Sequence, residues 1–374
     1  MALGRLIGSG IAHTLTIERL ALKLRAGDWV EVRSKAEILT SLDKKGCFQG
    51  LPFMPQMFQY CGQRFRVYKR AHKTCDTVNP IGGRWLAGGV HLPLRCDGKA
   101  YGGCQAACLL FWKEVWLKPV NKPQNLIGNS SPSEPWRDDE STDGSGCSEE
   151  DVWKATKAEH QQSADETRYV CQTTQLPNFT TSLRWWDPRQ YVEDYISRNA
   201  TLGRMFCGFV YACYYEFARR RKLGASFRWL YDRFQAVSGG VPFPRRTGTI
   251  PAGETTPTAT LNLQPGELVR VKSYNEILST LDSNNKNRGL FFDAELVPYC
   301  GGTYCVRARV SNFIDEKTGK MSSLRTPAVI LENVWCQSRY SDCRVGCPRS
   351  IYSWWREVWL ERIPEKDCQR ISQR

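Results

Sequence analysis

Residues 21–62 read ALKLRAGDWVEVRSKAEILTSLDKKGCFQGLPFMPQMFQYCG, and residues 260–301 read TLNLQPGELVRVKSYNEILSTLDSNNKNRGLFFDAELVPYCG. The two stretches align without a gap at an offset of 239 residues, and 17 of the 42 aligned positions are identical. Each is followed by nearly the same closing phrase, WKEVWL at residues 112–117 and WREVWL at residues 355–360. Self-similarity of this kind indicates a repeated structural unit. The sequence therefore predicts two related modules.

These two modules, at residues 20–120 and 258–363, have the pattern of short strands. The alternating leucines and valines of residues 22–32, on either side of a glycine turn, predict a hairpin with one buried face. Residues 37–42 predict a short helix or bend, and residues 116–117 a closing strand. Short strands and glycine turns in about a hundred residues favour a small barrel. The opening resembles the first hairpin of SH3-like barrels, so we expect a mainly β protein with two tandem SH3-like small barrels and a helical insert.

The stretch between the modules divides into two parts. Residues 121–167 form a predicted linker, because its portion at 127–166 carries eleven acidic and three basic residues, a local charge of −8. We expect this linker to be solvated and flexible. Residues 168–257 contain long apolar and aromatic runs and predict a folded, helical middle segment.

One run in the middle segment has an ambiguous placement. Thirteen mostly apolar residues, 205–217, precede four basic residues, 219–222, which predicts a helix with cations at its C-terminal end. Such a helix is too short to cross a bilayer. It is either buried against both barrels or in peripheral contact with a membrane, lying in the interface from Met205 to Lys222 with its basic end on anionic headgroups.

Composition narrows the class of protein. With 374 residues, 41% hydrophobic and 24% charged, the chain has the composition of a soluble globular protein of two or three domains rather than a disordered or fibrous one. We read no transmembrane segment and no secretory signal in it, and expect a cytoplasmic protein, with a membrane-peripheral one as the alternative. The net charge of +14 suits nucleic acid, an anionic membrane or an acidic partner.

Sixteen cysteines are the most informative feature of the composition. Without an export signal they are expected as thiolates that hold a metal or do redox work, rather than as disulfides. In the first module, Cys96, Cys104 and Cys108 lie close together in the sequence. Cys104 and Cys108 would share one face if that segment were helical, so that both sulfurs could reach one ion.

A fourth ligand for the first module can come from three places. We favour Cys75, because His72 and Asp76 beside it provide a polar environment. Cys61 is the runner-up, and Cys171 is an outsider from the middle segment. The second module supplies its own four thiols, Cys300, Cys336, Cys343 and Cys347.

Four thiolates complete a tetrahedral zinc site or a four-iron cluster. We therefore predict two iron-sulfur clusters (4Fe-4S) or two zinc ions, one per module. The alternatives are small buried core residues, since cysteine is among the most buried residue types, and disulfides. No Cys-x-x-Cys pair is present to strengthen the zinc interpretation. The predicted metal ligands are Cys75, Cys96, Cys104, Cys108, Cys300, Cys336, Cys343 and Cys347.

An enzymatic role would rest on fewer residues. Cys75 could be a reactive thiol, since Lys73 and Lys69 would lower its pKa, with His72 or His91 as the base. No nucleophile elbow, Walker loop, dinucleotide fingerprint or metalloprotease helix occurs in the sequence.

Several phrases together carry a family resemblance: GLPFMPQMFQYCGQRFRVYKRAHKTCDT, RCDGKAYGGCQAACLLFWKEVWL, WWDPRQY, PFPRRTG and CPRSIYSWWREVWLERI. Along nearly its whole length outside the acidic linker, the chain resembles a bacterial family of cysteine-rich proteins with two SH3-like modules, often encoded beside biosynthetic genes. The resemblance implies an accessory role in making a small molecule or a glycan. It brings no catalytic residues with it.

Three functions from different classes follow from these patterns. The first is a metal-thiolate protein, iron-sulfur or zinc, acting as an accessory or redox component of a biosynthetic pathway with a protein partner. The second is a zinc-stabilised basic scaffold that binds a protein or nucleic acid. The third is an enzyme that uses Cys75 with His72 or His91.

Overall fold

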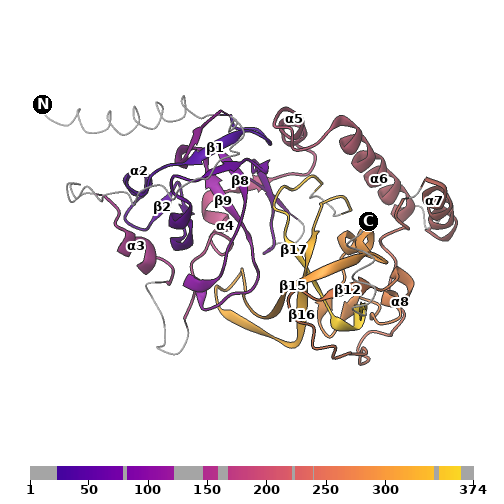
Figure 1. Ribbon diagram of the computed structural model, residues 1–374. Helices are drawn as coiled ribbons and strands as arrows, with labels where there is room; N and C mark the ends of the chain where they lie inside the picture. Colours follow the sequence, from indigo (N-terminus) through magenta and orange to yellow (C-terminus); the bar gives the residue numbers. More distant parts are fainter. Residues whose placement is uncertain are drawn as a thin grey trace, which may run out of the picture.

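The computed structural model describes residues 23–78, 82–121, 146–158, 167–220, 224–238, 240–340 and 345–363. As predicted, the fold is mainly β and consists of small antiparallel sheets with few helices. Two halves lie side by side, the first ending in β10 and the second beginning with β12, and most of the helices connect them (Figure 1).

Three small sheets make up most of the first half. The β-strand β1 lies between β10 and β4, β8 lies between β5 and β9, and β7 lies between β11 and β6. A two-stranded ribbon, β2 with β3, completes it. The bounds of these strands are β1 Trp29–Val32, β2 Cys47–Phe48, β3 Leu51–Pro52, β4 Arg64–Arg66, β5 Lys69–Arg70, β6 Lys73–Cys75, β7 Gly83–Trp85, β8 Gly89–Arg95, β9 Leu109–Lys113, β10 Leu117–Pro119 and β11 Thr181–Leu183.

The pairing of β1 differs from the sequence prediction. Val30 and Val32 are fully buried and alternate with half-exposed neighbours, as the pattern predicts. However, Val30 pairs with Phe65 of β4 and Pro119 of β10, so the hairpin expected within residues 22–32 does not form. Because Gly27 has φ +97°, the chain turns sharply just before β1, and the preceding residues leave the sheet.

The second half has one five-stranded sheet, in the order β17-β16-β15-β12-β18. Its ribbon β13-β14 resembles β2-β3 of the first half in length and position. The bounds are β12 Leu268–Val271, β13 Lys286–Asn287, β14 Leu290–Phe291, β15 Thr303–Ile314, β16 Met321–Trp335, β17 Tyr352–Trp355 and β18 Leu360–Arg362.

The two halves use the same order of elements at their start and end. β12 lies between β15 and β18, as β1 lies between β4 and β10. A short capped helix follows each of these strands, and a 3-10 turn precedes each closing strand. Among the described residues no sheet closes on itself, so the barrels expected from the sequence stay a prediction. The short helices and turns are α2 Lys35–Ser41, η1 Pro55–Tyr60, η2 Lys99–Tyr101, η3 Glu114–Trp116, α8 Tyr274–Leu278, η4 Ala294–Tyr299 and η5 Glu357–Trp359.

Parts of the predicted linker and middle segment pack on the first half. The helix α3 (Glu149–Lys154) starts with a capping box in which Ser148 and Asp151 bond each other's backbone N–H groups. Val152 on this helix is 1% exposed and belongs to the first core. A solvated linker is therefore wrong for residues 146–158.

The next stretch, residues 167–183, also joins the first half. The helix α4 (Leu176–Phe179) buries Leu176 and Phe179 in the first core, and β11 extends the sheet of β6 and β7. This stretch thus folds with the first module rather than with the helices that follow it.

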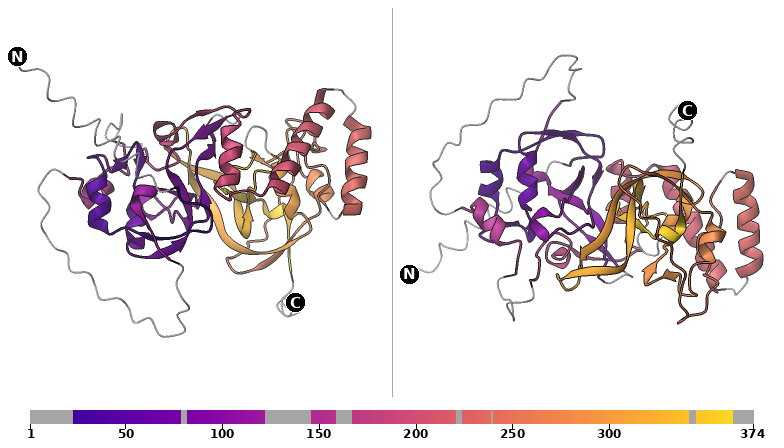
Figure 2. Two further views of the ribbon diagram at one scale, coloured as in Figure 1. Left: turned by 90° about the horizontal axis from the view of Figure 1, so that it is seen from above. Right: turned by 60° about the horizontal axis from the view of Figure 1, so that its bottom comes forward.

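Three further helices follow: α5 (Arg189–Ile196), α6 (Leu202–Arg220) and α7 (Gly224–Ser238). The predicted helix at residues 205–217 is confirmed and lies within α6. In both views of Figure 2, α6 and α7 form an antiparallel pair at the outer edge of the molecule, beside the second half. Burial of α6 against both barrels is wrong, because Phe206 and Phe209 are 67% and 66% exposed.

The halves meet through the long hairpin of β15 and β16. Ile314 at the end of β15 is buried in the core of the first half, and Met321 at the start of β16 packs against it. The backbone N–H of Gln105 in the first half donates to the carbonyl of Asn312 in this hairpin at 3.0 Å. Within the described residues, no helix is both long enough and apolar enough to span a membrane.

Candidate functional site: buried thiols where the halves meet

A buried polar segment runs through β6 in the first half. Lys73 is 4% exposed, and its Nζ donates to Asp194 Oδ2 at 2.5 Å and to the carbonyl of Val345 at 2.8 Å. His72 Nε2 lies 3.3 Å from the other oxygen of Asp194. Asp194 belongs to α5 and Val345 to the second half. Contacts with both of these elements therefore fix the position of β6.

Cys75, at the end of β6, contacts Cys347 of the second half. The backbone N–H of Cys75 donates to Cys347 Sγ at 3.2 Å, and both residues are buried. A hydrogen bond from the Cys75 thiol lowers the pKa of Cys347 below the ordinary range, with help from the backbone N–H groups of Arg349 and Cys75. These two thiols, 272 residues apart, therefore form one site across the two halves.

A buried arginine lies beside the two thiols. Arg349 is 2% exposed, and its Nη2 donates to Glu316 Oε1 at 2.7 Å. Its Nη1 donates to Thr77 Oγ1 at 3.2 Å and approaches Cys75 Sγ at 4.0 Å. Burial opposes a charge on Arg349, but Glu316 and then the nearby cysteines raise its pKa above the ordinary value. The guanidinium thus stays positive and favours thiolates around it.

Cys336 is a third thiol of this site. Its backbone N–H donates to the carbonyl of Ile351 at 2.8 Å, which fixes it beside the start of β17. Burial raises the pKa of Cys336, and the charges of Glu295 and Cys75 raise it further. We call Cys75, Cys336 and Cys347 the interface thiol group. Cys343, a predicted ligand, lies outside the described residues.

Four other cysteines interact with one another in the first half: Cys96, Cys104, Cys108 and Cys171. We call them the first-half thiol group. Burial raises the pKa of Cys96 to about 12, and Cys171 and Cys104 are among the neighbours that raise it further. Burial also raises the pKa of Cys108, with Cys96 and Cys171 again contributing. Each of the four thiols therefore lies close enough to at least one other to interact with it electrostatically.

Hydrogen bonds fix this group against its surroundings. The backbone N–H of Cys96 donates to the carbonyl of Cys108 at 2.8 Å. Gln56 Nε2 donates to Cys96 Sγ at 3.2 Å, and the backbone N–H of Ile314 donates to Cys104 Sγ at 3.4 Å. Because Ile314 belongs to the β15–β16 hairpin, the second half contacts this group as well.

The structure corrects the local geometry expected for the first module. Residues 104–108 are irregular rather than helical, and Ala107 has φ +48°. The structure brings Cys96, Cys104 and Cys108 together with Cys171, whereas Cys75 lies with the second half. The sequence left Cys171 as an outsider because it is far away in the chain. Cys171, Gln172 and Thr173 are all buried, but nothing in the local sequence indicates this burial, because it depends on packing against the first half.

Cys61 and Cys300 lie apart from both groups. Each is the C-cap residue of a 3-10 helix, η1 and η4, and packs against the core of its own half. Burial raises the pKa of Cys61 to about 11 and that of Cys300 to about 12, and in neither case does another cysteine contribute. The structure thus does not bring Cys300 to Cys336 and Cys347.

Neither a disulfide nor a formed metal cluster occurs in the described part of the chain. No disulfide links its cysteines. No three or more His, Cys, Asp or Glu residues among those described are arranged to hold a metal ion as they stand. Within each thiol group the cysteines lie near one another, but the side chains that the structure describes do not form a complete coordination site.

The two candidate histidines are both buried. His72 is 2% exposed and is held by Asp194 and the carbonyl of Gln190. His91 is fully buried, with Nδ1 at 2.9 Å from the carbonyl of Leu110. Burial lowers the pKa of His91 to about 3, so its ring is neutral at pH 7. No water-exposed ring is available at either position to exchange protons with a substrate in solution.

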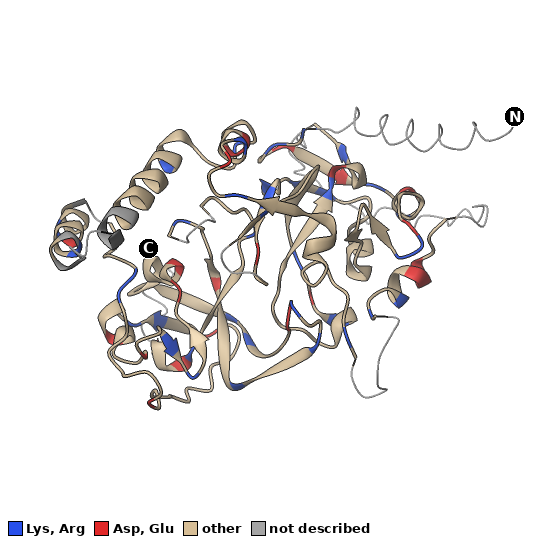
Figure 3. Ribbon diagram, turned by 180° about the vertical axis from the view of Figure 1, so that it is seen from behind, with Lys and Arg blue, Asp and Glu red and all other residues tan. Residues whose placement is uncertain are grey.

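Arg349 connects the two thiol groups electrostatically. Burial and then the charge of Glu316 raise the pKa of Cys108 well above its ordinary value. The guanidinium of Arg349, which also lies beside Cys75, partly offsets this rise. Elsewhere, Lys and Arg are spread over both halves among Asp and Glu (Figure 3). The buried positive charge at the contact between the halves is thus shared by sulfur from both groups.

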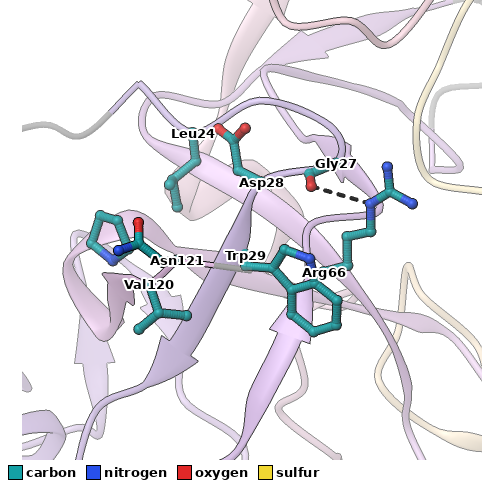
Figure 4. Close-up of a pocket in the computed structure, with 8 residues that line it drawn as sticks. Leu24, Gly27, Asp28, Trp29, Arg66, Val120 and Asn121 are labelled. Carbon is teal, nitrogen blue, oxygen red and sulfur yellow. Dashed lines mark hydrogen bonds between the residues drawn. The ribbon is translucent and has the colours of Figure 1, made fainter. Parts of the chain in front are cut away.

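An open pocket of about 520 Å³ lies on the first half, away from these thiols. Leu24, Trp29 and Val120 give it an apolar floor, and Arg66 donates from Nε to the carbonyl of Gly27 at 3.1 Å beside it (Figure 4). The side chains that line it include no cysteine and no histidine. The pocket therefore shares no side chain with either thiol group.

Comparisons with protein families, with curated proteins and with solved structures found no match to this chain.

Proposed function

We propose that the protein is a metal-thiolate protein whose two thiol groups each bind a metal centre, and that it acts as an accessory or redox component of a biosynthetic pathway. The observation that carries this proposal is the gathering of seven buried or half-buried cysteines into two groups. In the first-half group, Cys171 joins thiols from more than sixty residues earlier in the chain; in the interface group, Cys75 joins thiols from the other half.

The chemistry of the donors supports this proposal. Burial keeps most of these thiols protonated, and removing their protons without a compensating cation would leave several negative charges in a medium of low polarity. A bound cation reverses that balance, because thiolate is the form that binds metal. Four thiolates suit either zinc or a four-iron cluster. The first-half group supplies four sulfurs from described residues.

The interface group supplies three sulfurs from described residues. Its fourth predicted ligand, Cys343, stays a prediction. Arg349 supports a thiolate centre here, because a guanidinium near Cys75 offsets negative charge on the sulfurs and donates hydrogen bonds to neighbouring groups. Such outer contacts tune the potential of a redox centre.

Anaerobic purification followed by elemental analysis and a visible spectrum tests this proposal. Cys104→Ser and Cys336→Ser should each remove about half of the bound metal, because each variant breaks one of two sites. Cys305→Ser is the matched control, since Cys305 is half-buried but belongs to neither group. Equal metal content in all three variants and the wild type would overturn the assignment of ligands.

A second candidate, thiol–disulfide exchange, is favoured by the contact between Cys75 and Cys347. The Cys347 thiolate would attack one sulfur of a substrate disulfide and release the first substrate thiolate. Cys75 would then give up its proton, and its sulfur would attack Cys347 and release the second. The products are a Cys75–Cys347 disulfide and two substrate thiols. Treating metal-free protein with oxidised glutathione should give this cross-link by peptide mass spectrometry; its absence would leave only the metal proposal.

We further propose that the two halves arose by duplication of one SH3-like module. The matched order of elements and the capping boxes at Ser34 and Ser273, which lie 239 residues apart, support this. A protein partner in the pathway is part of this proposal, because an accessory or redox component acts for another enzyme. Binding to nucleic acid would require an affinity that falls steeply with salt, which a titration at two ionic strengths would detect.

A further inference from the structure

The outward side of α6 carries a stripe of large apolar side chains. Leu202, Phe206, Phe209 and Val210 follow the spacing i, i+4, i+7 and i+8, which places them on one face of a helix. Their exposed fractions are 61%, 67%, 66% and 48%. An apolar stripe with this degree of exposure is unusual on a protein surface that contacts only water.

The neighbouring helix carries a second stripe. Trp229, Leu230, Phe234 and Val237 of α7 are 64%, 57%, 68% and 90% exposed. Together with the four residues of α6 they form one surface, which we call the hairpin face. The two helices that carry it lie beside each other and are in contact (Figure 2).

Packing on the opposite side fixes the direction of the hairpin face. The ring of Tyr211 on α6 lies 4.9 Å from that of Tyr340 in the second half. On α7, the ring of Tyr231 lies 5.6 Å from that of Phe243. A Cβ added at Gly208 would come within 3.3 Å of Val345. The tyrosine sides of both helices are therefore turned toward the protein, and the hairpin face is turned away from it.

The charge of these helices indicates what covers the hairpin face. In sequence, α6 and α7 contain five arginines and only two acidic residues, Glu216 and Asp232, a net charge of +3. Asp232 already forms an ion pair with Arg246. Arg233 is exposed on α7, next to the apolar stripe, whereas Arg204 of α6 donates to Gln337 of the second half. Aromatic residues flanked by cations are the composition of helices that lie in an anionic membrane interface.

We infer that the hairpin face binds the surface of an anionic lipid bilayer. Its phenylalanines and Trp229 would enter the boundary between headgroups and acyl chains, while Arg233 would contact lipid phosphates. A second copy of the chain fits less well, because an isologous contact would place two cationic hairpins against each other. This inference is independent of the metal proposal.

Sedimentation of the full-length protein, as purified, with vesicles tests the inference. Vesicles of phosphatidylcholine with phosphatidylglycerol should bind the protein at least tenfold more tightly than vesicles of phosphatidylcholine alone, since a cationic surface gains from anionic lipid. Raising the salt from about 0.1 M to about 0.5 M should weaken binding several-fold. Equal binding to both vesicles, or to neither, would overturn the inference.

The double variant Phe206→Ser with Phe209→Ser should lose tenfold or more of the vesicle affinity, because both phenylalanine side chains would be buried in the bilayer interface. Phe291→Ser is the matched control, since Phe291 is 50% exposed on β14, outside the hairpin face. Circular dichroism should show that both variants remain folded. If the wild type ignores vesicles but forms dimers that the double variant does not, the hairpin face is instead a contact between copies.

Discussion

At the scale of single residues, Arg349 is the side chain on which the interface thiol group depends. Its ion pair with Glu316 is buried on the arginine side, and the same guanidinium contacts Thr77. Removing one partner of a buried pair leaves an uncompensated charge. Arg349→Met should therefore lower the free energy of unfolding by about 3 kcal/mol, measured by urea denaturation. Arg307→Met, which breaks an exposed pair with Glu332, should cost less than about 1 kcal/mol; equal losses would contradict this account.

His91 gives a pH dependence with a definite sign. Its pKa is lowered to about 3 in the folded protein by burial, whereas an unfolded histidine titrates near its ordinary value. Between these two values the unfolded chain binds the extra proton, so stability falls as the pH falls. Going from about pH 7 to pH 5 should cost roughly 2 kcal/mol through this residue. In His91→Gln, urea denaturation at both pH values should show that contribution gone; an unchanged difference would contradict it.

The sequence identified which cysteines belong to the site, but it did not predict how deeply the neighbouring side chains are buried. Cys75, Cys336 and Cys347 were all singled out as ligands, and the structure groups them. The burial of His72 and His91 was not predictable, because their ring partners come from α5 and from the neighbouring strand β9. Local sequence carries no record of such distant contacts.

At the scale of elements, the two capping boxes are the most closely matched local structures of the two halves. Ser34 caps α2 and Ser273 caps α8, each with a glutamate three residues later. Ser34→Ala and Ser273→Ala should each cost about 1 kcal/mol of unfolding free energy, because each removes the acceptor for an orphan N–H group. Thr40→Ala, whose exposed hydroxyl bonds only a carbonyl within α2, should be nearly neutral. A loss confined to one of the two serine variants would contradict equivalent caps.

Element type was predictable where the pattern is local, and strand pairing was not. Alternation identified the buried valines of β1, and the apolar run identified α6. The partners of β1 depend on residues more than thirty positions away, and the turn at Gly27 directs the expected partner strand out of the sheet. For α6, the apolar character predicted a helix but not which side faces water, because that depends on Tyr340 and Val345 of the second half.

At the scale of the whole molecule, the thiol groups lie where the two halves touch. The sequence predicted one metal site within each module, since the repeat suggests that each copy is self-contained. The structure instead brings Cys75 to Cys347 and places the β15–β16 hairpin against Cys104. A metal bound at these positions would link the two halves as well as act as a redox or structural centre. Removing the metal should therefore lower the unfolding free energy of both halves together.

The metal content of the chain purified without oxygen tests the central claim most directly. We predict about two zinc atoms per chain, or about eight iron atoms with a broad absorption near 400 nm that bleaches on reduction. A protein that is folded and fully reduced yet carries neither metal, even after anaerobic incubation with zinc or with iron and sulfide, would contradict the claim.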